Sequence, residues 1–171
     1  MKPGVLYRLD LLARNLTPFL LTLLFVFVSV IPLQIPGLSH IIPLLPLMAI
    51  YHWAVYRVEL LPAYSVFIIG ILQDIFTGAP IGVNALVFLL VYGVVLTQHR
   101  FLFGKSFAVI WVGFGLISGT ASALTWILVS AWNVAIIDPS AIYIQFLLTF
   151  GMFPGVAWGL LRWQRTFLGS S

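Results

Sequence analysis

Long apolar stretches follow one another along this chain, and only short polar breaks separate them. A helix that spans the hydrocarbon core of a bilayer needs about 20 mostly apolar residues. Of the 171 residues, 62% are hydrophobic and only 7% are charged, whereas soluble domains average about 25% charged residues. A water-soluble fold would have too few charges to cover its surface. We therefore predict an all-α polytopic membrane protein without a sizeable extramembrane domain.

The apolar stretches predict a single integral membrane domain, residues 1–171, with a bundle of six helices. The expected spans are about 18–33, 41–56, 60–76, 83–98, 107–130 and 142–161. Pro18 suits the first turn of its helix. The second, third and fourth spans are short, because a helix of about 16 residues reaches only about 24 Å across a core of about 30 Å. We expect neighbouring helices to shield them, although short spans also mark ligand sites in transporters.

Basic residues predict the orientation of the six spans, because short cytoplasmic loops are enriched in them. Six spans with a cytoplasmic N-terminus place all eight basic residues on the cytoplasmic side, and Asp138 on the other side. Both termini are then cytoplasmic. The eight residues are Lys2, Arg8, Arg14, Arg57, Arg100, Lys105, Arg162 and Arg165.

Polar and small residues gather between the third and fourth spans. Gly70, Asp74, Gly78 and Gly82 recur every four residues, and Pro80 and Asn84 complete the segment. We expect a tight helical hairpin in which Gly78 ends one helix and Asn84 caps the next. A carboxylate in a membrane span suggests a function by default. For Asp74 we favour a structural cap near interfacial water, with a partner contact or ion handling as alternatives.

Two rows of small residues lie on the last two spans. Gly115 and Gly119 form the first row, and Gly151, Gly155 and Gly159 form the second. Rows with this spacing let helix backbones approach closely. We expect them to serve packing within the bundle, with dimerisation as the alternative.

The residues that catalysis or metal binding would need are missing or scattered. The chain has no cysteine, and Asp74 has no second carboxylate within the spans. The three histidines, His40, His52 and His99, are predicted at different depths, which argues against a metal site. We expect a protein that is not an enzyme and that binds no cofactor or metal.

Two segments give the chain a family resemblance. The hairpin Asp74–Ala85 (DIFTGAPIGVNA) and the preceding Tyr51–Pro62 (YHWAVYRVELLP) resemble the bacterial rod-shape-determining membrane protein family, MreD. The resemblance implies a non-enzymatic component of the cell-elongation complex of the inner membrane. Its implied partners are the bitopic protein MreC, MreB filaments, and the RodA and PBP2 peptidoglycan synthases. It also implies a fold similar to the six-helix substrate-binding subunits of vitamin transporters.

Two other functions remain open. A small-molecule-binding subunit of a transporter needs several polar groups that converge on a pocket. The polar residues available on the far side are Gln73, Asp74, Asn84, Asn133 and Asp138. An ion or proton path needs a chain of ionisable groups across the bilayer, which Asp74 alone does not provide.

Overall fold

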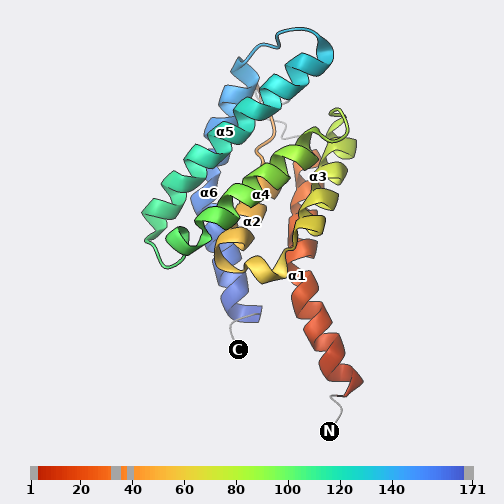
Figure 1. Ribbon diagram of the computed structural model, residues 1–171, viewed down its shortest axis with the longest axis vertical. Coiled ribbons are helices and arrows are strands. Elements are labelled where there is room, and N and C mark those ends of the chain that lie inside the picture. Colours follow the sequence, from red (N-terminus) through yellow and green to blue (C-terminus); the bar gives the residue numbers. More distant parts are fainter. Residues whose placement is uncertain (1–3, 32–35, 38–40, 168–171) are drawn as a thin grey trace.

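The computed structural model describes residues 4–31, 36–37 and 41–167, and these residues form a helical bundle (Figure 1). The predicted end of the first span at Leu33, most of the loop to His40 and the basic residue Lys2 lie outside the described residues. Within those residues the elements are α1 (Val5–Val30), α2 (Leu45–Tyr56), the 3-10 turn η1 (Val58–Leu60), α3 (Ala63–Thr77), α4 (Val83–Leu102), α5 (Phe107–Asn133) and α6 (Ser140–Phe167).

The start of α1 and the end of α6 lie at the same end of the bundle, and the α3–α4 and α5–α6 connections lie at the opposite end (Figure 1). Four of the described helices, α1, α4, α5 and α6, are long and apolar enough to cross a membrane. The helix α2 has 12 residues and α3 has 15, which correspond to about 18 Å and about 22 Å. These two are shorter than the hydrocarbon core of about 30 Å.

The short helix α2 forms the core of the bundle. Every residue from Leu45 to Val55 is buried, and α2 contacts α1, α4 and α6. Pro46 lies in its first turn, where the missing amide has no helical acceptor to lose. The Tyr51 hydroxyl donates to the Ile110 carbonyl of α5 at 2.9 Å. The helix α2, which is too short to span the bilayer alone, is thus enclosed by protein. This agrees with the expectation that neighbouring helices shield it.

The helix α1 is much longer than the predicted first span. It begins at Val5, and Pro18 lies inside it instead of in its first turn, so the predicted start of the helix is wrong. Asp10 and Arg14 form an ion pair one turn apart, at 3.1 Å. Such a pair is compatible with a helix outside the hydrocarbon core. The first turns of α1 extend away from the other helices (Figure 1).

The helices α4 and α6 also continue past their predicted ends. Arg100 lies inside α4, and Arg162 and Arg165 lie inside α6. Hydropathy marks where a helix leaves the hydrocarbon, whereas the hydrogen-bonded helix continues until a backbone break. These basic residues are therefore helical residues and not loop residues.

One polar contact joins α5 to α6 where Pro154 interrupts the hydrogen bonding of α6. Because proline has no backbone N–H, the carbonyl of Phe150 loses its helical donor. The Trp111 indole of α5 supplies a replacement, since its Nε1–H donates to the Phe150 carbonyl at 3.0 Å. The Trp111 ring also stacks on the Phe150 ring at 5.1 Å between centroids.

Candidate functional site

The α3–α4 hairpin is built on two glycines with positive φ. Gly78 ends α3 with φ 70°, and its N–H donates to the Asp74 carbonyl. Gly82 precedes α4 with φ 103°. Side chains strongly disfavour such backbone angles, and glycine adopts them at little cost. The predicted end of the third helix at Gly78 is confirmed.

The Asp74 carboxylate ties the two helices of the hairpin together. Its Oδ2 accepts the Gly82 N–H at 2.8 Å. Its Oδ1 accepts both the Asn84 backbone N–H at 3.0 Å and the Asn84 Nδ2–H at 2.9 Å. The side chain is fully buried. A buried carboxylate is stabilised when several donors share its charge, so Asp74 closes the hairpin from inside.

The predicted roles of Asp74 and Asn84 need two corrections. Asp74 does cap backbone amides of the turn, but it is enclosed by protein and does not meet interfacial water. Asn84 does not cap α4, because Gly82 occupies the cap position. The Asn84 amide instead turns back to Asp74. The position of Asn84 in the sequence suggested a local cap, but its side chain donates to the Asp74 carboxylate of the other helix instead.

Gly70 lets α3 and α4 cross at backbone contact. A Cβ atom added at Gly70 would lie 2.3 Å from the Ala85 Cα and 2.7 Å from the Ala85 nitrogen. Both atoms belong to the backbone of α4, so they could not yield without separating the helices. Together the polar residue Asp74 and the glycines at 70, 78 and 82 define one compact unit, which we name the Asp74 hairpin (residues 70–85).

Next to the Asp74 hairpin, α1, α3 and α6 meet around a polar cavity of about 300 Å³. Gln73 and Gln145 line it, and the Gln145 Nε2–H donates to the Ile42 carbonyl at 2.7 Å. The Ser29 hydroxyl of α1 lies 3.3 Å from the Gln73 Oε1. Gln145 was not among the polar residues selected from the sequence, because its partner lies 103 residues away along the chain.

The other predicted polar residues of this end do not join that cavity. The Asn133 Nδ2–H donates to the Val129 carbonyl within α5 at 2.9 Å. Asp138 is exposed and accepts the Ser140 N–H at 3.0 Å, and this hydrogen bond lowers the pKa of Asp138 below its ordinary value. The five polar residues thus divide among four places, and only Gln73 faces the polar cavity.

The two glycine rows face in different directions. A Cβ at Gly115 would lie 2.6 Å from the Phe150 ring, and one at Gly119 would lie 3.5 Å from the Phe146 ring, so this row faces α6. A Cβ at Gly151, Gly155 or Gly159 would meet no atom within 4 Å, and all three residues are exposed. The prediction that the second row packs within the bundle is therefore wrong.

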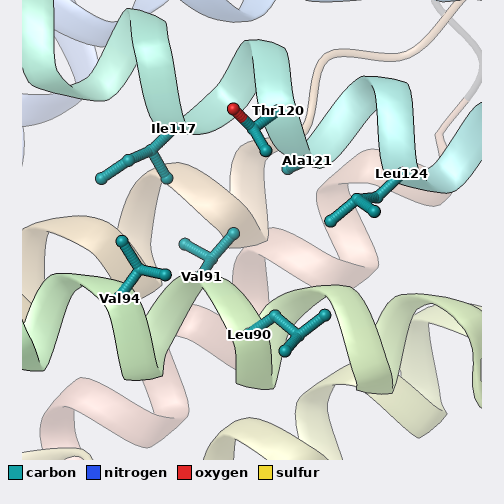
Figure 2. A pocket seen from close by; sticks show the side chains of 7 residues that line it. All are labelled: Leu90, Val91, Val94, Ile117, Thr120, Ala121 and Leu124. Atoms are coloured by element: carbon teal, nitrogen blue, oxygen red, sulfur yellow. The ribbon is translucent and has the colours of Figure 1, made fainter.

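A small apolar cavity lies between α4 and α5 (Figure 2). Its volume is about 90 Å³. Its one hydroxyl, on Thr120, already donates to the Leu116 carbonyl at 2.9 Å. The cavity therefore offers a ligand no free hydroxyl hydrogen to donate. It is lined by Leu90, Val91, Val94, Ile117, Thr120, Ala121 and Leu124.

The described residues bring no catalytic group together. They contain no cluster of three or more His, Cys, Asp or Glu side chains that could hold a metal ion. The Ser118 hydroxyl of α5 donates to the Gly115 carbonyl. His52 is fully buried in α2, and the His99 ring of α4 contacts the Ala54 carbonyl at 3.1 Å.

A family model described as rod shape-determining protein MreD matches residues 11–156. The match contains the whole Asp74 hairpin and helices α2 to α5. No curated protein and no solved structure matches the chain.

Proposed function

The chain belongs to the MreD family of rod shape-determining proteins, and we propose that it is a non-enzymatic subunit of the bacterial cell-elongation complex. In this role it supports lateral peptidoglycan synthesis through contacts of its helix faces with other membrane proteins. The family match carries the proposal. The long apolar helices and the hydrogen-bonded Asp74 hairpin support it, because they suit a protein that contacts its partners inside the bilayer.

The proposal includes the partners that the family resemblance implies and the orientation that the basic residues predict. The direct partner is an MreC-type bitopic protein, which connects the chain to MreB-type filaments and to RodA/PBP2-type synthases. The chain lies in the bacterial inner membrane with six spans, and both termini are cytoplasmic. The distribution of basic residues supports this orientation, and both described ends lie at the same end of the bundle (Figure 1).

Depletion of the chain in its source organism tests the proposal. Rod-shaped cells should become round, and a fluorescent D-amino acid should no longer enter the lateral wall. Re-expression of the chain should restore both properties. Two carboxylate variants, Asp74→Ala and Asp138→Ala, then test whether rod shape depends on the buried hairpin and not on the exposed loop. Unchanged rod shape after depletion, in a host without a second copy, would refute the proposal.

A small-molecule-binding subunit of a transporter is the second candidate. The polar cavity of about 300 Å³ beside Gln73 and Gln145 favours it, because ligand sites combine such a volume with a few polar groups. The similarity to vitamin-transporter subunits stays a prediction. If this candidate is right, a vitamin panel should raise the melting temperature of the purified chain, and Gln145→Leu should abolish the shift. No shift across the panel would exclude those vitamins as ligands.

A further inference from the structure

The last turns of α6 carry a pair of exposed arginines, Arg162 and Arg165. From Ser140 to Leu161 the helix has no charged residue. At about 1.5 Å per residue this stretch is about 33 Å long, which matches a hydrocarbon core of about 30 Å. Arg162 is the next residue, so the pair begins where the helix leaves the hydrocarbon and enters the layer of lipid headgroups.

No acidic side chain among the described residues forms an ion pair with these two arginines. The chain has four acidic residues, and each of them is engaged elsewhere. Two form ion pairs with Arg14 and Arg57, one closes the Asp74 hairpin, and one accepts a hydrogen bond at the start of α6. The four are Asp10, Glu59, Asp74 and Asp138. The arginine pair therefore offers two positive charges to an anion from another molecule.

The arginines belong to a hollow on the surface of α6 that has a basic part and an apolar part. The Arg162 guanidinium lies over the Trp158 ring, 5.4 Å from the ring centroid, and this cation–π contact favours one position of the guanidinium. Trp158 is 63% exposed, and tryptophan is enriched at the boundary between hydrocarbon and headgroups. The hollow is lined by Trp158, Leu161, Arg162, Arg165 and Thr166.

We propose that this hollow binds the headgroup of an anionic phospholipid. Arg162 and Arg165 donate hydrogen bonds to the lipid phosphate, because a guanidinium presents paired N–H groups that match phosphate oxygens. The glycerol and the first acyl carbons lie along Trp158 and Leu161. The site goes beyond the proposed function, because its occupant is a lipid and not a partner protein.

The order of the side chains along α6 favours a lipid over a free phosphate. A phospholipid places its acyl chains inside the hydrocarbon core and its phosphate at the edge. The apolar side chains of Trp158 and Leu161 come first along α6, and the two arginines follow in the same order. A free phosphate would use only the arginines. A zwitterionic lipid would add a cation close to two guanidinium groups, which repel it.

Native mass spectrometry of the full chain, released from detergent micelles, tests the proposal. Phosphatidylglycerol and phosphatidylcholine with the same acyl chains are titrated in parallel, and the Kd of the first bound lipid is measured for each. Phosphatidylglycerol should bind about ten-fold more tightly. Glycerol 3-phosphate, which carries the phosphate without acyl chains, should not displace it at an equal concentration.

Two double variants that remove the same charge show whether binding depends on the hollow. Arg162→Gln/Arg165→Gln should weaken phosphatidylglycerol binding about 30-fold. Arg100→Gln/Lys105→Gln changes exposed positions at the end of α4 and in the α4–α5 connection, and it should change the Kd less than about three-fold. Trp158→Leu should weaken binding about three-fold. If the first double variant lowers the melting temperature, Arg165→Gln alone replaces it and should weaken binding about five-fold.

Four results would overturn the proposal. Equal affinity for phosphatidylglycerol and phosphatidylcholine would remove the anionic headgroup from the account. Equal losses in the two double variants would assign binding to net charge and not to the hollow. Displacement by an equal concentration of glycerol 3-phosphate would make a free phosphate the ligand. A poly-glutamate peptide that binds more tightly than the lipid would instead indicate a contact for an acidic protein segment.

Discussion

The three hydrogen bonds to Asp74 allow a quantitative prediction for the Asp74 hairpin. Asp74→Ala removes the acceptor of the Gly82 N–H, the Asn84 N–H and the Asn84 Nδ2–H. The acceptor is fully buried, so water cannot simply replace it. Asp74→Asn is a milder change, because one amide oxygen can still accept the two bonds from Asn84. Its NH₂ group, however, would face the Gly82 N–H.

The expected loss of stability follows from the number of bonds. Hydrogen bonds in membrane proteins contribute about 0.6 kcal/mol on average and about 1.7 kcal/mol at most. Three bonds then give a loss of about 2–5 kcal/mol in the free energy of unfolding for Asp74→Ala. For Asp74→Asn, one lost bond and one donor–donor contact give about 1–2 kcal/mol. Asp138→Ala removes an exposed carboxylate with one backbone bond, and it should lower the free energy of unfolding much less than Asp74→Ala does.

Unfolding of the purified chain in mixed micelles measures these differences, with SDS as the denaturant. A double-mutant cycle with Asn84→Ala isolates the side-chain pair, because residues in one hydrogen-bond network couple. The cycle should give a favourable coupling energy of about 0.5–2 kcal/mol. If Asp74→Ala unfolds at the same SDS concentration as the parent chain, the carboxylate does not hold the hairpin. In that case the role of Asp74 would lie in binding a partner or an ion, and the structural interpretation fails.

Three further predictions follow from other contacts of the bundle. Gly70→Ala forces α3 away from α4 and should lower the free energy of unfolding by about 1–3 kcal/mol in the same SDS assay. The control Gly93→Ala places its new Cβ where no atom lies within 4 Å, so it should be neutral or slightly stabilising. Equal effects of the two variants would refute the close crossing of α3 and α4. Trp111→Phe leaves the Phe150 carbonyl unpaired and should lower the free energy of unfolding by about 1–2 kcal/mol. The loss should be smaller in a Pro154→Ala background, because the alanine at that position supplies a backbone N–H to that carbonyl. Additive losses for the two substitutions would contradict this account. The lowered pKa of Asp138 means that its bond to the start of α6 stabilises the fold fully above the ordinary value of 3.8, and that this contribution is lost as the pH falls through the lowered pKa. A carboxyl titration by NMR checks the direction, and a pKa at or above 3.8 would refute it.

The sequence predicted the parts of the fold that depend on local chemistry. The α3–α4 hairpin was predicted because Gly78 follows an apolar helix and can adopt a positive φ. The helix α5 was predicted well, since the apolar stretch 107–130 matches Phe107–Asn133 closely. The family resemblance, which rested on the hairpin and the segment before it, is confirmed by the match over residues 11–156.

The sequence could not predict features that depend on distant residues. Hydropathy measures preference for lipid, so it missed the charged first turns of α1, which are helical outside the apolar stretch. The cap preference of Asn84 is a local rule, and it failed because Asp74 lies within reach only after the hairpin folds. Spacing alone showed that Gly151 and Gly155 share a face of α6 but not which way that face points.

The buried position of α2 also constrains how the protein is made. The 12 residues of α2 are too short to span the core alone, yet the helices α4 and α6 that enclose α2 are synthesised after it. During translation α2 therefore leaves the ribosome when α1 has been made but α4 and α6 have not. It must wait at the insertion machinery or at the membrane surface until the later helices arrive. The chain consequently completes its fold only after its last helix is inserted, and any product that stops before α6 lacks one of the helices that cover α2.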